Sequence, residues 1–247
     1  MSTYQTFARF YDELTQNVEY EKIAGCFDSL ILRYGKKGLL VDLGCGTGSL
    51  SIALAKLGHE VIGVDSSEMM LSQAFNKMYG AGQSITFLHQ NMEELDLYGT
   101  IENVVSSLDS LNHVMEDEAL LRTFQRVSLF LERGGLFLFD VNTPYKHEEV
   151  LGDETFVYDL DNIYCVWNNE YDRVKKQTQI SLDFFEAQED GSYVRTGEQF
   201  FERPLDRGQI EALCKGSGLK VIAEFDDYTL GPVHEKTQRA IYVTQKI

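Results

Sequence analysis

Apolar residues in this chain follow two spacings, which predict two kinds of secondary structure. Uninterrupted apolar stretches at 39–43 and 136–141 are typical of strands buried on both faces of a parallel sheet. Between such stretches, apolar residues recur three and four positions apart, as in amphipathic helices. This alternation predicts a parallel sheet with helices on both faces. The expected strands are 38–43, 60–65, 84–89, 101–107 and 135–141, and the expected helices lie near 48–57, 67–79 and 117–132.

Helices and strands are also predicted near both ends of the chain. Residues 3–34 are predicted to form two helices, because Tyr4, Phe7 and Tyr11 fall on one helical face. Near the other end, the pattern predicts a helix followed by two strands. Their expected ranges are 206–216, 219–226 and 239–246.

A different pattern occupies residues 154–203, after Pro144. This segment is rich in β-branched and aromatic residues with period-two stretches, which is typical of strands. Turn sequences at 160–162 and 189–192 separate the stretches, so we expect three or four antiparallel strands. Because no flexible linker borders the segment, we expect one domain with an inserted β cap. The predicted boundaries are 1–145 and 204–247 for the main part and 146–203 for the cap.

The turn after the first buried strand is the most informative sequence in the chain. It holds one acid and three glycines: Asp42, Gly44, Gly46 and Gly48. Glycine lets the backbone approach a ligand closely and adopt positive φ, and the helix that follows presents its N-terminus to the same place. The dinucleotide pattern G-x-G-x-x-G would need glycine at Ser49, and the acid before the turn would repel a pyrophosphate. The next strand ends at Asp65, where a carboxylate can accept both hydroxyls of a ribose.

In these segments the chain resembles the class I S-adenosylmethionine-dependent methyltransferases. Their motif [D/E]-x-G-x-G-x-G matches the acid and the three glycines, and their second-strand acid matches Asp65. Three further segments, 87–92, 104–113 and 131–140, resemble the family in the same order along the chain. The resemblance implies an α/β fold with S-adenosyl-L-methionine as cofactor. It implies a seven-stranded doubly wound Rossmann-like sheet of strand order 3-2-1-4-5-7-6, in which the last strand is antiparallel.

The resemblance also implies which residues bind the cofactor. Ser66 would line the adenine pocket and Met70 would pack on the adenine, although a methionine on an amphipathic helix is also a common core residue. Asn91 stands where the family generally has an aspartate that meets the adenine amino group, and an amide oxygen can do the same. The implied cofactor-binding set is Tyr4, Asp42, Gly44, Gly46, Gly48, Asp65, Ser66, Met70, Asn91, Met92 and Asp109.

Candidates for the acceptor side lie near the ends of the fourth and fifth strands and on the first helix. Asp109 and His113 follow the fourth strand, and Asn142 shares a face with Asp140 on the fifth. The N-terminal signature Y-x-x-F-A-x-x-Y-D-x-L resembles small-molecule methyltransferases, including amine-methylating ones. There a tyrosine reaches the cofactor or acceptor, a role implied here for Tyr4 or Tyr11. The candidate catalytic residues are Tyr11, Asp109, His113 and Asn142.

Each of these residues also has a structural interpretation that the sequence leaves open. The tyrosines could simply dock the first helix, Asp109 could cap its loop, and His113 could be a packing residue. No metal site is expected, because the cysteines are scattered and form no C-x-x-C pair.

The composition of the chain limits the kinds of binding partner that are expected. The formal net charge of −17 disfavours nucleic acid and anionic membrane surfaces, although it could serve solubility alone. No apolar run approaches 18 residues and no leader pattern is present, so we expect a soluble cytoplasmic protein, a monomer or homodimer. The predicted function is methyl transfer to a small-molecule acceptor, with nitrogen favoured. The alternatives are an NAD-dependent oxidoreductase, a non-catalytic S-adenosylmethionine-binding protein and a tRNA-modifying methyltransferase.

Overall fold

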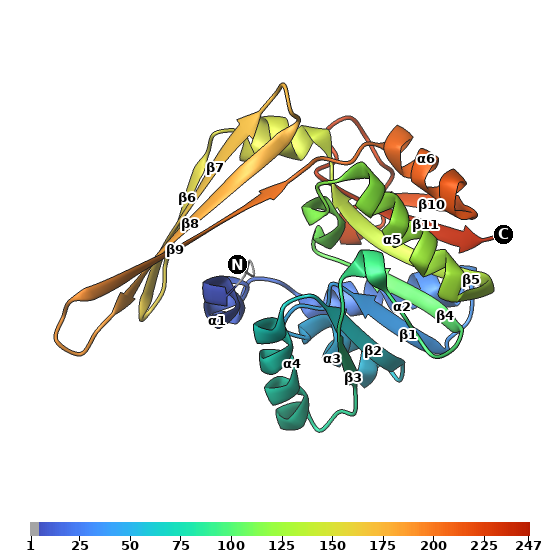
Figure 1. The fold of residues 1–247 in the computed structure, drawn as a ribbon, viewed down its shortest axis with the longest axis horizontal. Coiled ribbons are helices and arrows are strands. Elements are labelled where there is room, and N and C mark those ends of the chain that lie inside the picture. Colours follow the sequence, from blue (N-terminus) through green and yellow to red (C-terminus); the bar gives the residue numbers. More distant parts are fainter. Residues whose placement is uncertain (1–4) are drawn as a thin grey trace.

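The computed structural model describes residues 5–247, which form a large twisted sheet covered by helices and a smaller sheet beside it (Figure 1). The large sheet has seven strands in the order β10-β11-β5-β4-β1-β2-β3. β11 is antiparallel to β10 and β5, and all other neighbouring pairs in this sheet are parallel. The predicted strand order and the single reversed strand are confirmed. The strands are β1 (Leu39–Leu43), β2 (Glu60–Asp65), β3 (Thr86–His89), β4 (Ile101–Ser106), β5 (Leu131–Asn142), β10 (Leu219–Asp226) and β11 (Arg239–Lys246).

Helices cover both faces of this sheet, as the alternating pattern predicted. One apolar cluster joins α2, α3 and α4 to one face, and a second joins α5 and α6 to the other. The helices are α2 (Tyr20–Tyr34), α3 (Ser49–Lys56), α4 (Glu68–Ala81), α5 (Asp117–Phe130) and α6 (Arg207–Ser217). Among the described residues, no helix is long and apolar enough to cross a membrane.

One boundary differs clearly from the prediction. The helix expected to run to residue 132 ends at Phe130, and β5 begins at Leu131, four residues before the expected strand. Leu131 pairs with Ile101 of β4, and a register irregularity follows before the regular ladder resumes. Gly134 lies there with φ of +80°, so the Gly-Gly pair extends the strand through a bulge where the sequence suggested a turn.

The second sheet is the predicted cap. Four antiparallel strands follow each other in chain order and extend away from the main body as a long twisted ribbon (Figure 1). They are β6 (Thr155–Asp159), β7 (Ile163–Asp172), β8 (Gln177–Ala187) and β9 (Tyr193–Glu202). Both predicted turns are present, and the turn at 173–176, which contains no glycine, was missed. There the Asp172 carboxylate accepts the N–H groups of Val174 and Lys175, which closes the turn without a glycine.

Helix α1 (Gln5–Leu14) lies between the cap and the main sheet (Figure 1). Its Phe7 and Phe10 pack with the inward face of the cap in a third apolar cluster that includes Phe184 of β8. The same helix contacts α4 of the main body. The cap is therefore joined to the large sheet through α1, and the predicted catalytic residues meet in the space beside α1.

Candidate active site

The glycine turn joins β1 to α3 and has the backbone conformation that its sequence predicts. Gly44, Gly46 and Gly48 have φ of +79°, +52° and +74°, a region that residues with a Cβ rarely adopt. A Cβ on Gly44 would lie 2.8 Å from the Met92 methyl and from Ser110, whereas one on Gly46 would meet nothing within 4 Å. The turn is thus closely packed at its first glycine and open at its second, which leaves room for a ligand against the backbone at Gly46.

Two carboxylates flank the turn. Asp65, at the end of β2, accepts the N–H groups of Gly46 and Ser67, both at 2.8 Å. Burial raises the pKa of Asp65, although the two hydrogen bonds act in the opposite direction. Each oxygen retains a second lone pair, so the predicted contact with ribose hydroxyls is sterically and chemically compatible with this arrangement.

Asp42 lies beneath the turn and is almost fully buried. The hydroxyl of Ser51 donates to it at 2.5 Å, and burial raises its pKa to about 7. It lines a small space that we call the turn cavity, of about 40 Å³, together with Gly44, Gly46 and Tyr11.

A larger cavity of about 490 Å³, here called the edge cavity, adjoins the turn cavity at Ser110. Three predicted cofactor residues line it: Ser66, Asn91 and Met92. The Asn91 amide is exposed and donates to the Glu94 carboxylate at 3.2 Å. These positions agree with the predicted adenine side, and the individual contacts remain predictions.

One predicted cofactor residue, Met70, lies away from these two cavities. Met70 does not line the edge or turn cavity; it is buried in the apolar cluster with Phe7 and Phe10 of α1. This packing agrees with a core role for Met70, which is one of the two interpretations that the sequence left open. Contact of Met70 with adenine stays a prediction. Tyr4 lies outside the described residues.

A third space, the cap cavity of about 260 Å³, lies between α1, the inward face of the cap and the ends of β4, β5 and β11. It brings together residues from all parts of the chain, and it shares Tyr11 and Leu108 with the turn cavity. It also shares His113 and Phe200 with the edge cavity. All four predicted catalytic residues line it: Tyr11, Asp109, His113 and Asn142. Three charged residues that the sequence did not single out line it as well: Lys146, Glu202 and Arg239.

Asp109 is held in place by a charged network. It has φ of +60°, and the Asp140 carboxylate accepts the N–H groups of Leu108 and Asp109 at 2.8 and 2.9 Å. Arg239 of β11 donates to Asp109 at 2.6 Å and also to Asp140. Tyr228 donates its hydroxyl to Asp140 too. Burial alone would raise the pKa of Asp109, but the charges of Arg239 and Lys146 lower it to about 2.

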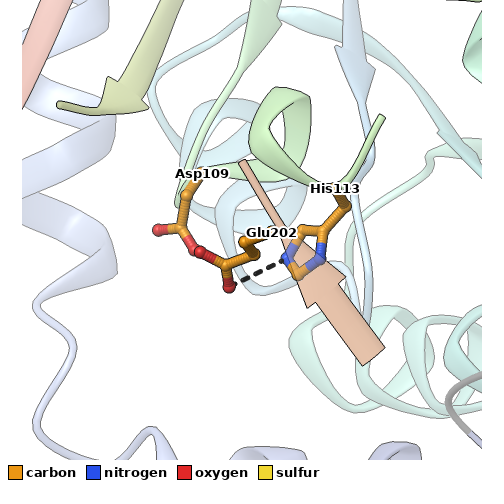
Figure 2. Close-up of side chains that lie close together, drawn as sticks. All are labelled: Asp109, His113 and Glu202. Carbon is orange, nitrogen blue, oxygen red and sulfur yellow. Dashed lines mark ion pairs between the residues drawn. The ribbon is translucent and has the colours of Figure 1, made fainter. Parts of the chain in front are cut away.

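Glu202 reaches the same place from the end of β9. Its side chain is almost completely buried, and Figure 2 shows it converging with Asp109 and His113. Its Oε1 lies 3.6 Å from His113 Nε2, and Asn142 donates its Nδ2 to Oε2 at 3.4 Å. Burial raises the pKa of Glu202. Among the described residues, no lysine or arginine lies within ion-pair distance of this carboxylate.

Two buried polar atoms beside Glu202 have no hydrogen-bond partner among the described residues: His147 Nε2 and Asn142 Oδ1. His147 Nε2 lies 3.9 Å from Glu202 Oε2, while its Nδ1 lies 2.7 Å from the Thr178 hydroxyl. Burial lowers the pKa of His147 to about 4, so its ring is neutral near pH 7. Buried polar groups are nearly always paired, and two unpaired ones at one place are typical of a site that binds a polar ligand or water.

Helix α1 is fastened to the glycine turn by the acid of its signature. Asp12 accepts the Thr47 hydroxyl at 2.7 Å and the Lys77 ammonium at 2.8 Å. Lys77 also donates to the hydroxyls of Thr47 and Ser49 at 2.7 and 2.6 Å. Nearby, burial and the neighbouring Tyr20 raise the pKa of Tyr11 well above its usual range, so its phenol stays protonated.

Known proteins resemble this chain over its whole length. The methyltransferase domain family matches residues 40–135. A putative methyltransferase from Geobacillus sp. (strain WCH70) is 32% identical over 246 residues, which cover 99% of this chain and 100% of the relative. This chain belongs to the class I S-adenosylmethionine-dependent methyltransferases. The cofactor of this methyltransferase is therefore S-adenosyl-L-methionine, and the alternative of an NAD-dependent oxidoreductase is not supported.

Solved structures agree with that assignment. An S-adenosylmethionine-dependent methyltransferase from Clostridium acetobutylicum ATCC 824 superimposes with a TM-score of 0.88 at 29% identity, covering 98% of both chains. The sugar N-methyltransferase KedS8 from Streptoalloteichus sp. ATCC 53650 superimposes with a TM-score of 0.77 at 17% identity, covering 99% of this chain and 93% of that one. The second likeness shows a shared fold. The cap is part of that shared fold, because the superpositions extend over nearly the whole methyltransferase.

The glycine turn of this methyltransferase fits its cofactor. The open space at Gly46 lets an extended ligand lie against the backbone, and the Asp65 carboxylate stands beside it at the end of β2. Lys146, Glu202 and Arg239 escaped the sequence analysis because nothing local marks them. Arg239 begins the last strand, 130 residues after its partner Asp109, and only the fold brings the two together.

Proposed function

We propose that this methyltransferase transfers a methyl group to the nitrogen of a small molecule held in the cap cavity. The observation that carries the proposal is the charge of that cavity. Arg239 is shared between Asp109 and the buried Asp140 behind the cavity, and no lysine or arginine of the described residues lies within ion-pair distance of Glu202. A buried carboxylate without a paired lysine or arginine favours a cationic ligand, and an amine is a cation near neutral pH.

In methyl transfer the protein itself takes little part in making and breaking covalent bonds. The cofactor supplies an electrophilic methyl group attached to a positively charged sulfur. The residues of the chain have to bind the acceptor, exclude water and align the nitrogen, and such alignment contributes up to about 7–11 kcal/mol of barrier reduction at its limit. Tyr11 and Leu108 line both the turn cavity and the cap cavity, so they lie at the boundary between cofactor and acceptor.

Two further points support a small acceptor. KedS8, which shares the fold, is a sugar N-methyltransferase, and a molecule of sugar size suits a cavity of about 260 Å³. We propose that residues 146–203 act as the acceptor-selecting part, because β9 supplies Glu202 and β8 and β9 supply apolar walls at Ile180 and Phe200. The net charge of −17 continues to disfavour RNA as the acceptor.

The test has two stages. Calorimetric titration with S-adenosylmethionine and S-adenosylhomocysteine, with NAD as control, should give binding of the first two only. A panel of amino sugars, simple amines, phenols and carboxylates is then incubated with methyl-labelled cofactor, and label should pass to amines. Methylation of phenols or carboxylates alone would refute the nitrogen acceptor. Label transferred to unmodified tRNA, but to no small molecule, would support the tRNA-modifying alternative.

A further inference from the structure

The carboxylates of the cap cavity differ in what they can still bind. Asp140 accepts two backbone N–H groups, the Tyr228 hydroxyl and Arg239, so its capacity is used. Asp109 is bound to Arg239 at 2.6 Å. Among the described residues, Glu202 accepts only the long bond from Asn142, and two histidine rings lie beside it. It is the carboxylate of this group with room for another donor.

The unpaired atoms next to Glu202 provide a second, independent sign of a ligand. Asn142 Oδ1 and His147 Nε2 are both buried, and the Asn142 side chain lines the cavity. A ligand with several N–H donors can satisfy Glu202 and Asn142 Oδ1 together. An ammonium group has three such donors in a small volume.

We propose that Glu202 binds the acceptor as an ammonium ion and takes its proton, and that His113 passes this proton to solvent. This rests on the proposed nitrogen acceptor. An N–H bond of the ammonium breaks, its electron pair stays on nitrogen, and the proton forms an O–H bond with Glu202. The neutral amine then has the lone pair that methyl transfer requires. The proton leaves Glu202 for His113 Nε2, 3.6 Å from Oε1, and then reaches water, because the His113 side chain is 28% exposed (Figure 2).

The raised pKa of Glu202 suits this role. A carboxylate with an ordinary pKa is a weak acceptor for an ammonium proton, and burial of Glu202 makes it a stronger one. Asp109, with a pKa of about 2, is a poor proton acceptor and acts as a fixed negative charge. Among the described residues, the titratable or charged groups that line the cavity with Glu202 or lie beside it are Tyr11, Asp109, His113, Lys146, His147, Tyr158 and Arg239.

A divalent metal is the competing occupant, because ligand atoms of Asp109, His113 and Glu202 lie within 4.8 Å of one another. A metal would have to displace Arg239 from Asp109. It would also bring two positive charges into a cavity that Lys146 and Arg239 already line. An ammonium ion brings one charge and can bind Glu202 while Arg239 stays on Asp109.

The first experiment measures binding to enzyme saturated with S-adenosylhomocysteine, using cyclohexylammonium and the uncharged cyclohexanol as probes. Glu202→Gln should weaken cyclohexylammonium binding by roughly tenfold or more, as the loss of a charge-assisted hydrogen bond implies, and leave cyclohexanol binding unchanged. Glu170→Gln is the matched control, since Glu170 is exposed on β7 of the same sheet. Equal cyclohexylammonium affinity in wild type and Glu202→Gln, or no binding to wild type, would overturn the inference.

A second measurement needs no variant at the site. Ionised Glu202 is required for binding, so cyclohexylammonium affinity of wild type should fall as the pH drops through the raised pKa of Glu202, while cyclohexanol affinity should not.

His113→Ala should lower kcat with little change in KM for any amine found in the panel, and added imidazole should restore part of the rate. No rescue by imidazole would overturn the role of His113.

The outcomes separate the two proposals. If S-adenosylhomocysteine does not bind, the proposed function fails. If it binds, and cyclohexylammonium binds independently of Glu202, the inference fails while the proposed function stands. Loss of cyclohexylammonium binding on addition of a chelator, together with Glu202-dependent binding of Mg²⁺ or Zn²⁺, would replace the ammonium site with a metal site.

Discussion

Replacing Arg239 with methionine is expected to destabilise the protein strongly at neutral pH. The guanidinium is only 14% exposed and binds the carboxylates of Asp109 and Asp140, of which the second is fully buried. Methionine keeps much of the side-chain volume and removes the charge, so both carboxylates lose their cation. Breaking a buried pair in this way costs about 3–5 kcal/mol.

The pH dependence gives a second, independent expectation. The folded pKa of Asp109 is about 2, below its usual value of 3.8. A depressed acid pKa contributes stability that is present above the unfolded value and lost as the pH falls towards the folded one. Here that contribution is on the order of 2 kcal/mol, fully present near pH 7 and lost between about pH 4 and pH 2. Without Arg239, burial raises the pKa of Asp109, so acid protonates the carboxyl and relieves the variant. The stability difference from wild type should therefore shrink as the pH falls from 7 towards 4.

Urea unfolding at several pH values measures both effects. Arg207→Met is the control, because Arg207 also bridges two acids, Glu211 and Glu224, but its side chain is 65% exposed. Surface pairs of that kind contribute up to about 1 kcal/mol. If Arg239→Met costs no more than Arg207→Met, or if its cost is the same at pH 7 and pH 4, the account of the charged network is wrong.

Three further predictions concern the cofactor, the reaction and the first helix. Asp65→Ala should weaken S-adenosylmethionine binding by about 1.5–3 kcal/mol for each hydrogen bond to the carboxylate, measured by calorimetry, and unchanged affinity would exclude the ribose contact. Asn142→Ala and Tyr11→Phe should leave S-adenosylhomocysteine affinity within about twofold and reduce turnover, because Asn142 lines the cap cavity and Tyr11→Phe keeps the ring that borders the turn cavity; a matching loss of cofactor affinity would place them on the cofactor side instead. Lys77→Met should loosen α1, since it removes the cation that joins Asp12 to Thr47 and Ser49. Hydrogen exchange should then accelerate in α1 and not in α6, and unchanged exchange in α1 would show that apolar packing alone holds the helix.

The positions of the parallel strands and the glycine turn were predictable because their signals are local, whereas the order of the strands in the sheet was predicted from the family resemblance. Buried parallel strands leave short apolar stretches, and the turn needs glycine at positions where φ is positive, as at Gly44 and Gly48. The start of β5 was not predictable in the same way. Leu131 to Gly135 has the composition of a helix end and a turn, and only pairing with β4 makes it strand.

In the candidate site, too, some residues were predictable from local sequence and others were not. Asp109 and His113 follow β4, and Asn142 is the last residue of β5. The carboxyl ends of parallel strands are where such sheets place functional residues, so strand prediction was enough to name these three as candidates. Glu202 ends an antiparallel strand and Arg239 begins one, at places where charged residues are usually solvated. Their importance arises from burial by segments that are distant in the sequence, and no local pattern records that burial.

Helix α1 contacts both binding spaces, and this has a thermodynamic consequence. Tyr11 lines the turn cavity and the cap cavity, and the neighbouring Asp12 is bonded to the glycine turn through Thr47. A cofactor that steadies the glycine turn also steadies the wall of the acceptor cavity. Such coupling is reciprocal: whatever factor the cofactor adds to acceptor affinity, the acceptor adds to cofactor affinity. Under the proposed function, each ligand therefore strengthens the binding of the other through α1.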